Sequence, residues 1–337
     1  MGDMRKDYVL EREVIVHPTT KKNTDTKKCP YCPGNESMTN PSMLSLVAKD
    51  GMLQRLQDSD DFFVKDWSVR VFESKNPAVS TSPENSYSDL PLYSEPAYGY
   101  HYIIVASSKH AETFATLDVE QWGNTLVVIQ DRLRWLYTQR GVTYISIFIN
   151  HGKNAGAVID HPHVNMISFS NIPPVIEAEA EASHRFLNEK GVCPMCQVIN
   201  TEMGGPRQIL QTEGFVAFCP WAPSHPFEFW IYPKSHQYSF TLIDNNEIED
   251  LAQILRSTLG GLDNVLNSPS YNIVFHNSLN EIDSEIHWHI EIIPQLSYDT
   301  GFDAGYGLSV NPLAPEKSAE ILGKYSRREL ASLVGVV

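Results

Sequence analysis

Two short histidine motifs contain the residues of this sequence that are best suited to chemistry. The first, H-P-H-V-N, spans residues 161–165, and the second, H-W-H-I-E, spans residues 287–291. Alternate residues of a β-strand point to the same face, so each motif would place two imidazoles and one amide or carboxylate side by side. Imidazole can act as a nucleophile, a proton carrier or a metal ligand. Both motifs are therefore candidate reactive surfaces.

The spacing of the histidines indicates an internal duplication. His161 and His287 are 126 positions apart (287 − 161), and so are His110 and His236 (236 − 110). An isolated H-P-H would most simply be a pair of surface histidines beside a proline. A second copy that keeps its register over this distance argues against that interpretation.

Helical patterns between the histidines repeat with the same offset. Asp118 is followed three residues later by Gln121, and Asp244 by Glu247, which is the spacing of a helix-capping box. Apolar residues then recur in both halves with the spacing of an amphipathic helix. They are Trp122, Leu126, Ile129, Leu133 and Leu136 in the first half, and Ile248, Ala252, Leu255, Leu259 and Leu262 in the second.

Two C-P-x-C pairs stand near the heads of the two halves, at residues 29–32 and 193–196, and Cys219 is left as a small buried thiol. A thioredoxin-like redox motif would be a single pair, so two pairs indicate metal binding. Four-ligand sites are closed and structural, so we expect two zinc ions per chain that brace the histidine strands. The predicted ligands are Cys29, Cys32, His110 and His161, and Cys193, Cys196, His236 and His287.

The composition argues against several classes of protein. The chain has 337 residues, 42% of them apolar, which suffices for a sizeable core. Its net charge of −15 argues against a nucleic-acid surface, which needs a basic stripe to displace counterions. No apolar run reaches membrane-spanning length and the N-terminus leads into no signal-peptide core, so we expect a cytoplasmic protein that does not bind membranes.

These patterns predict an α+β protein made of two fused halves. Residues 1–170 would form the first half, residues 171–192 a connecting helix, and residues 193–337 the second half, each half with one zinc site. Residues 35–60 are predicted to be irregular because they are polar, and residues 301–307 are predicted to be a glycine-rich turn segment.

Six motifs, taken in order, resemble those of the galactose-1-phosphate uridylyltransferase branch of the histidine-triad superfamily. The similarity runs from about residue 5 to about residue 316, and the second C-P-x-C pair is closer to plant-type relatives that phosphorolyse ADP-sugars. The motifs are C-P-Y-C at 29–32, N-H-G-K at 150–153, H-P-H at 161–163, C-P-M-C at 193–196, P-K-S-H at 233–236 and H-W-H at 287–289.

The resemblance implies two histidine-triad halves of antiparallel sheet flanked by helices, commonly assembled as a homodimer. It also implies that His163 is the nucleophile and His161 a zinc ligand. Neutral imidazole attacks phosphoanhydrides well and gives a labile phosphoramidate. Asn165 can donate an amide N–H to the phosphoryl oxygen, whereas a carboxylate at the matching Glu291 would repel it. We therefore expect only the first half to be active.

Five further positions are candidate substrate-binding residues because of the resemblance. Asn150, Gly152 and Lys153 form the loop before the nucleophile. Ser74 stands where the family has a nucleoside-binding Asn, and Asp303 where it has a Glu that binds sugar hydroxyls. The simpler interpretations are a solvated lysine for Lys153 and a turn aspartate for Asp303.

The sequence also departs from the family pattern around the phosphate. Asn165 replaces the usual Gln, Val158 replaces a phosphate-binding Ser, and the stretch T-T-K-K-N at 19–23 replaces an arginine-rich one. Lys21 or Lys22 could then hold the phosphate as point charges. These departures leave the nucleobase, the sugar and the acceptor open.

Three functions are compatible with these residues. The leading one is a nucleotidyltransferase that moves a nucleoside monophosphate, UMP first among the candidates, between a nucleotide sugar and a hexose 1-phosphate through a covalent His163 intermediate. The second is a phosphorylase or hydrolase of nucleotide sugars, such as ADP-sugars, in which phosphate or water collects the nucleotidyl group. The third is a non-catalytic, zinc-braced nucleotide-binding protein.

Overall fold

The computed structural model of the chain confirms an α+β fold. Among the residues that it describes, no helix combines the length and the hydropathy needed to cross a bilayer. The described residues are 2–16, 28–49, 52–59, 61–83, 88–89, 91–278, 286–296 and 300–335.

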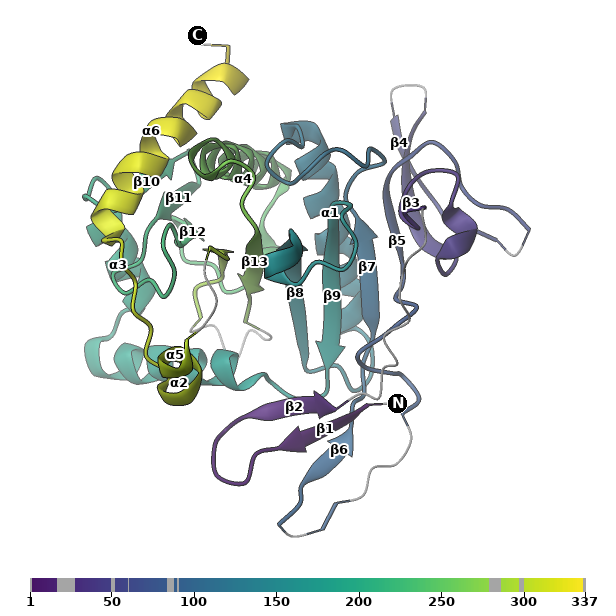
Figure 1. Cartoon of the computed structure of the whole chain (residues 1–337), viewed down its shortest axis with the longest axis horizontal. Helices are drawn as coiled ribbons and strands as arrows, with labels where there is room; N and C mark the ends of the chain where they lie inside the picture. The colour runs from purple at the N-terminus through teal and green to yellow at the C-terminus, as the bar shows by residue number, and fades with distance from the viewer. Residues whose placement is uncertain are drawn as a thin grey trace.

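One antiparallel sheet of eleven strands runs through the body of the protein (Figure 1). Strands β8 and β13 pair at its centre, so the sheet is continuous between the two halves. In spatial order the strands are β10 (Gln208–Gln211), β11 (Phe215–Phe218), β12 (Phe229–Pro233), β14 (His289–Pro294), β13 (Tyr271–His276), β8 (Tyr144–His151), β9 (His163–Phe169), β7 (His101–Val105), β5 (Trp67–Glu73), β3 (Ser42–Lys49) and β4 (Met52–Leu56).

Six α-helices and three short 3-10 helices accompany the sheet in the described residues. Helices α1 and α4 pack against each other and against strands of the sheet, and α6 packs on α4 and β10. The helices are α1 (Val119–Tyr137), α2 (Pro174–Lys190), α3 (Pro194–Glu202), α4 (Asn245–Leu266), α5 (Gly301–Tyr306) and α6 (Pro315–Leu333), with η1 (Glu36–Met38), η2 (Lys153–Ala155) and η3 (Phe240–Leu242).

The two predicted amphipathic helices are confirmed as α1 and α4. All ten apolar residues of the predicted stripes are buried, so each helix covers the sheet with the expected face. Helix α4 begins with the complete capping box of Asp244 and Glu247. At α1, Asp118 accepts the Gln121 amide, but the Gln121 side chain donates to the Ser68 and Ala106 carbonyls instead of closing the box.

The positions of these elements support the internal duplication. Helix α4 begins 126 residues after α1 (245 − 119), and β14 begins 126 residues after β9 (289 − 163). From the centre of the sheet outward, β8-β9-β7 mirrors β13-β14-β12. The division at residues 170 and 192 stays a prediction, because the sheet crosses from one half to the other without interruption.

Two local predictions were wrong. Residues 35–60 contain β3 and β4. In β3, the alternate side chains of Leu44 and Leu46 reach the core, which favours a strand in spite of the polar composition. Residues 301–306 form the short helix α5, because Thr300 caps it in spite of its glycines.

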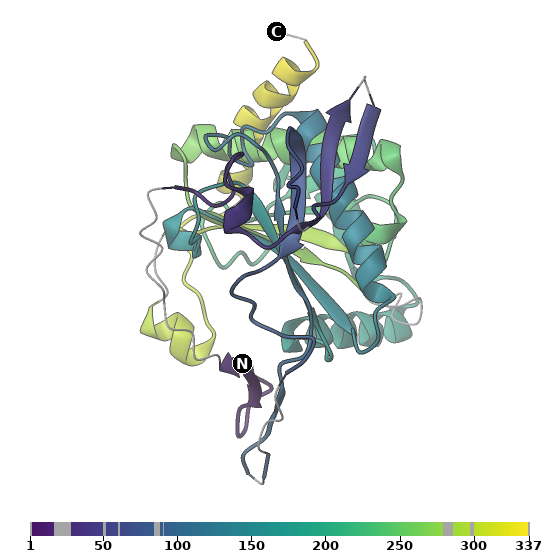
Figure 2. The same cartoon turned by 90° about the vertical axis from the view of Figure 1, so that its right-hand side faces the viewer.

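A small second sheet lies apart from the body. It joins β2 (Glu13–Val16), β1 (Asp3–Lys6) and β6 (Ser94–Pro96) in that order. Figures 1 and 2 show it projecting below the main sheet in two perpendicular views. Tyr8, Val9 and Leu10, in the turn that joins β1 to β2, are exposed. The sequence analysis did not anticipate this sheet.

Candidate active site and metal clusters

The proposed nucleophile His163 opens β9, near the middle of the sheet. Its Nδ1 lies 2.7 Å from the backbone oxygen of His161. A carbonyl only accepts hydrogen bonds, so Nδ1 carries the proton and the lone pair is on Nε2. Burial lowers the pKa of His163 below its ordinary value, since the hydrogen bond to His161 only partly opposes it. The ring is therefore neutral at pH 7, as an imidazole nucleophile must be.

Two apolar side chains lie beside this ring. Val105 of β7 stands opposite His163 and Ile103 opposite Asn165. Tyr31, from the first C-P-x-C turn, presents its ring to His163 with centroids 5.2 Å apart, and it also contacts Phe72. The first cysteine turn therefore packs the Tyr31 ring against His163 and also brings the Cys29 and Cys32 thiols to His161.

The structure adds His101 to the candidate site. Its Nε2 lies 3.4 Å from Asn165 Oδ1, and its Nδ1 accepts the Ala78 amide at 3.2 Å. Its backbone oxygen accepts the amide of Ser74, at 2.8 Å. Sequence reasoning missed His101 because it has no repeat partner: the residue 126 positions later is Phe227.

The loop before the nucleophile is held by the second half of the chain. Asn150 and Asn272 face each other across β8 and β13, and Asn272 Nδ2 donates to Asn150 Oδ1 at 2.8 Å. Gly152 adopts φ +79°, and a Cβ there would lie 2.3 Å from Ser270 Oγ, so only glycine fits. Lys153 is exposed at the start of η2. Whether these residues contact a substrate stays a prediction.

The structure gives the remaining predicted residues, Asp303 and Val158, contacts away from His163. Asp303 accepts the Thr300 amide and completes the capping box of α5. Val158 is 80% exposed and lines a small cavity of about 290 Å³ together with Cys29 and His110. Lys21 and Lys22 lie outside the described residues.

The first predicted metal cluster is assembled as expected. The ligand atoms of Cys29, Cys32, His110 and His161 all lie within 4.8 Å of one another. His161 Nε2 lies 2.8 Å from the Ser107 carbonyl, which fixes its proton there and turns the Nδ1 lone pair toward the thiols. Burial lowers the pKa of His161 to about 4, so it is neutral. The cluster could hold one metal ion.

The second cluster repeats the first. Cys193, Cys196, His236 and His287 also bring their ligand atoms within 4.8 Å of one another. Burial lowers the pKa of His287 to about 3, and burial beside Cys193 raises the pKa of Cys196 to about 11. A bound cation would favour the thiolate form that these conditions disfavour.

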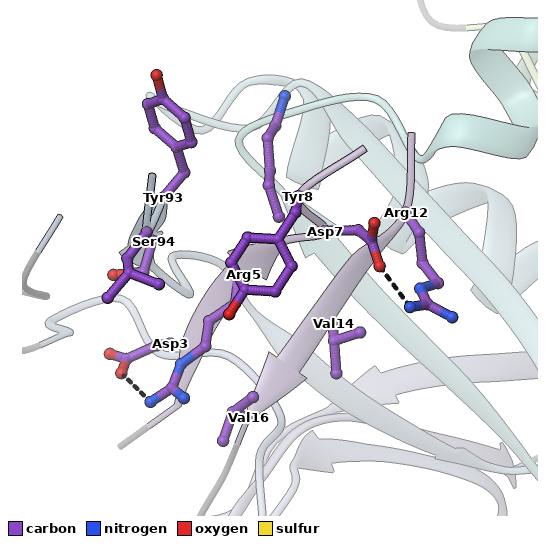
Figure 3. Close-up of a pocket in the computed structure, with 11 residues that line it drawn as sticks. Asp3, Arg5, Asp7, Tyr8, Arg12, Val14, Val16, Tyr93 and Ser94 are labelled. Carbon is purple, nitrogen blue, oxygen red and sulfur yellow. Dashed lines mark hydrogen bonds and ion pairs between the residues drawn. The ribbon is translucent and has the colours of Figure 1, made fainter. Parts of the chain in front are cut away.

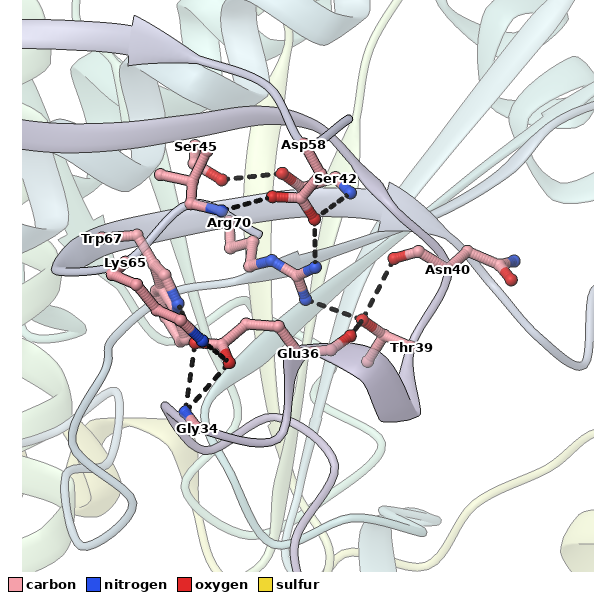
Figure 4. Close-up of polar contacts among 11 residues, drawn as sticks. Gly34, Glu36, Thr39, Asn40, Ser42, Ser45, Asp58, Lys65, Trp67 and Arg70 are labelled. Atoms are coloured by element: carbon pink, nitrogen blue, oxygen red, sulfur yellow. Dashed lines mark hydrogen bonds and ion pairs between the residues drawn. The ribbon is translucent and has the colours of Figure 1, made fainter. Parts of the chain in front are cut away.

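A buried polar network fastens the first cysteine turn to the sheet (Figure 4). Both carboxylate oxygens of Glu36 accept the Gly34 amide at 3.1 Å, and Lys65 and Trp67 donate to the same carboxylate. In the same network Arg70, which is 1% exposed, pairs with Asp58 at 2.6 Å. Through Glu36, the turn that carries Cys29 and Tyr31 is thereby fixed in position next to β5.

A third group of ionisable residues lies in the second half. Glu179 of α2 accepts from His276 Nδ1 at 2.9 Å, and its other oxygen lies 3.7 Å from His289 Nδ1. Glu291 lies 3.5 Å from His289 Nε2. The sequence analysis singled out neither His276 nor Glu179 as a site residue, and the alternating Glu-Ala segment that contains Glu179 is typical of a solvated helix.

A larger hollow of about 540 Å³ lies on the small N-terminal sheet (Figure 3). Its arginines are already neutralised, because Arg5 pairs with Asp3 at 3.3 Å and Arg12 pairs with Asp7. Tyr8 and Tyr93 also line it. The predicted nucleophile, metal ligands and substrate-binding residues do not line this hollow, so we do not place the active site there.

Comparison with known proteins agrees with this geometry. Residues 4–173, half of the chain, match the family model described as the galactose-1-phosphate uridyl transferase N-terminal domain, and residues 99–329 match a domain of unknown function, DUF4921. The chain is 29% identical to the ADP-glucose phosphorylase of Arabidopsis thaliana, over 96% of this chain and 93% of that protein. It is 27% identical to the galactose-1-phosphate uridylyltransferase of Thermotoga maritima, over 96% and 98%.

Solved structures show the same fold. A uridylyltransferase superposes with a TM-score of 0.83 at 24% identity, covering 97% of this chain and 99% of that one. The Arabidopsis thaliana ADP-glucose phosphorylase with bound ADP-glucose superposes with a TM-score of 0.75 at 26% identity, covering 96% and 99%. The chain belongs to the galactose-1-phosphate uridylyltransferase family.

Proposed function

We propose that this protein is a nucleotidyltransferase that moves a nucleoside monophosphate, UMP in the first instance, between a nucleotide sugar and a hexose 1-phosphate. The observation that carries the proposal is the state of His163: a buried, neutral ring whose Nδ1 proton is fixed on the His161 carbonyl. This leaves Nε2 as the nucleophilic atom. The uridylyltransferase relatives that match most of the chain support the same activity.

The reaction would proceed by two displacements at phosphorus. In the first, His163 Nε2 attacks the α-phosphorus, an N–P bond forms, and the P–O bond to the β-phosphate breaks, releasing sugar 1-phosphate. In the second, an oxygen of the incoming hexose 1-phosphate attacks the same phosphorus and the N–P bond breaks. Asn165 would donate its amide N–H to the phosphoryl oxygen on which charge accumulates.

We propose zinc as the metal of both Cys₂His₂ clusters. Bonds of about 2.3 Å to sulfur and 2.0 Å to nitrogen place neighbouring sulfur and nitrogen ligands of a tetrahedron about 3.5 Å apart. Cys32 Sγ lies 3.5 Å from His110 Nδ1 and 3.8 Å from His161 Nδ1. Cys196 Sγ lies 3.5 Å from His236 Nδ1 and 3.7 Å from His287 Nδ1. Four protein ligands leave no open position, so the ions would be structural.

A second candidate function is phosphorolysis of an ADP-sugar, with orthophosphate as the acceptor in the second step. The second C-P-x-C pair favours it, because the four ligands of a second cluster are complete here, as expected for plant-type relatives. The similarity to the Arabidopsis thaliana ADP-glucose phosphorylase supports it as well.

We propose a homodimer as the assembly. The exposed apolar side chains of the small sheet support a protein contact there, since Tyr8 is 75% and Val9 87% exposed. Light scattering coupled to size-exclusion chromatography would test it, and a monomer would contradict it.

The decisive experiment follows the nucleotidyl group. The protein is mixed with UDP- and ADP-sugars without acceptor, and its intact mass is measured. We expect one nucleotidyl adduct per chain, labile in acid and stable in alkali, together with free sugar 1-phosphate. The isolated adduct is then given hexose 1-phosphate or orthophosphate, and the acceptor that discharges it distinguishes the two candidates. No adduct and no positional isotope exchange would favour a binding protein instead.

A further inference from the structure

His101 has two hydrogen-bonding partners with different requirements. It lies on β7 two residues before Ile103, which stands opposite Asn165, so His101 is the diagonal neighbour of Asn165 on the face that carries His163. One ring nitrogen meets the Ala78 amide at 3.2 Å, and the other meets Asn165 Oδ1 at 3.4 Å.

These contacts fix the tautomer of the ring. The Ala78 amide can only donate, so Nδ1 of His101 is the acceptor and Nε2 carries the proton. Burial lowers the pKa of His101, and the neighbouring His163 acts in the same direction, so the ring is neutral at pH 7. The Nε2–H group then requires an acceptor, and this selects the oxygen of Asn165 as the atom that faces it.

We propose that His101 is a positioning residue that locks the carboxamide of Asn165 so that its N–H donors, and not its oxygen, are available to the phosphoryl group. The inference deepens the proposed function and rests on it for the role of Asn165. A carboxamide without this contact can rotate by half a turn and present an oxygen, which repels the phosphate. His101 itself need not touch the substrate.

A simpler role for His101 would be to hold the loop at Ser74 to Ala78. That role belongs to Nδ1 and the backbone oxygen, whereas the proposed role belongs to Nε2. Two conservative substitutions separate them. In His101→Asn the side-chain oxygen can replace Nδ1 but cannot reach Asn165, and in His101→Gln an amide N–H can replace Nε2–H.

The kinetic test compares these two variants in the purified full chain. We expect His101→Asn to lower kcat by about tenfold to a hundredfold, since loss of one such donor costs about that much, while His101→Gln retains most of kcat. In an Asn165→Ala background, His101→Asn should cause no further loss of kcat. The reverse order of the two variants, or a full additional loss in the double variant, would overturn the inference.

A second measurement reads the hydrogen bonds without turnover. Long-range ¹⁵N–¹H spectra of histidine-labelled protein should show His101 with its proton on Nε2. The side-chain amide signals of Asn165 should be retained in His101→Gln and displaced in His101→Asn. A proton on Nδ1, or amide signals indifferent to both variants, would refute the inference. Failure of the proposed function is distinguishable, because it appears as a wild-type protein that forms no adduct while these spectra stay as expected.

Discussion

His163 and His289 occupy matching positions in the two halves, yet their surroundings differ in bulk. Across the sheet from His163 stands Val105, and from Asn165 stands Ile103. In the second half Tyr232 stacks on His289 with ring centroids 4.4 Å apart and an interplanar angle of 12°, and Trp230 stands opposite Glu291. At these cross-strand positions the second half therefore has aromatic rings where the first half has the smaller Val105 and Ile103.

The two histidines also differ in charge environment. In both, Nδ1 meets the backbone oxygen two residues earlier, at 2.7 Å for His163 and 3.2 Å for His289. In addition, His289 lies 3.7 Å from Glu179 on its Nδ1 side and 3.5 Å from Glu291 on its Nε2 side. Two carboxylates would repel an incoming phosphate and hold His289 in place. This difference in neighbours supports our prediction that the H-x-H motif is catalytic in the first half and structural in the second.

The largest effect should come from exchanging the two histidines for alanine. His163→Ala removes the nucleophile, so we expect nucleotidyl transfer to fall by at least about 10⁴-fold. His289→Ala removes a packed ring and should keep appreciable activity in whatever fraction stays folded. Intact-mass adduct formation and circular dichroism of both variants provide the measurement. Equal loss of adduct in two folded variants would show that both halves contribute to catalysis.

The metal clusters allow the next comparison. Wild-type protein should contain about two zinc ions per chain, and Cys29→Ser and Cys193→Ser should each retain about one. Both variants should melt at lower temperature. Cys29→Ser should also lose more activity, because its cluster includes His161, two residues from the nucleophile.

Elemental analysis and thermal unfolding of the same samples measure both effects. A folded wild-type protein without metal would contradict the assignment of the clusters. Equal activity loss at equal stability loss would contradict the difference between the halves.

The sequence predicted the two Cys₂His₂ clusters and the strand that carries His163 well, because their residue types are diagnostic and their repeat offset is constant. The sequence did not predict residues whose contacts come from a distant strand or that lie in a common helical pattern. His101 acquires its role from Asn165, 64 positions away, through the register of β7 and β9, which no local pattern encodes. Glu179 lies in a segment that alternates Ala and Glu, and only the placement of α2 shows that it meets His276 and His289.

A smaller effect, on KM, should show that a residue of the second half positions the candidate substrate loop of the first half. Asn272 donates to Asn150 Oδ1 at 2.8 Å and to the Ala155 carbonyl at 2.9 Å, so it fixes the candidate substrate loop. Asn272→Ala should raise KM for the nucleotide sugar roughly fivefold, as expected for about 1 kcal/mol from one hydrogen bond, with little change in kcat.

Steady-state kinetics with Gln295→Ala as the matched control would test this. Gln295 donates to Asn272 at 2.9 Å but not to Asn150, so its removal should have a weaker effect. If Asn150→Ala raises KM and Asn272→Ala does not, the contact between the halves has no functional role.

The smallest effect is a pH dependence of stability specific to the second half. Burial alone would lower the pKa of His276, but the hydrogen bond with Glu179 and the charges of Glu291 and Glu179 raise it above 6.5. A group whose pKa is raised by folding contributes stability that is complete below its unfolded pKa and is lost as pH rises through the folded value. Burial alone would raise the pKa of Glu179, but these histidines lower it below 4.5, so its own contribution is lost only in acid.

The wild-type melting temperature should therefore contain a component that declines as the pH rises above 6.5, worth roughly 2–4 °C for each kcal/mol involved. His276→Gln keeps a hydrogen bond to Glu179 but cannot be protonated. Its hydrogen bond should therefore contribute the same stability at every pH, and the pH-dependent component should be absent. Thermal scans of both proteins between pH 6 and pH 9 measure the difference. Because burial shifts the pKa of His163 in the opposite direction, below 6.5, adduct formation should not decline together with this stability component as the pH rises. Parallel pH profiles of stability in the two proteins would show that the His276 pair is not the source.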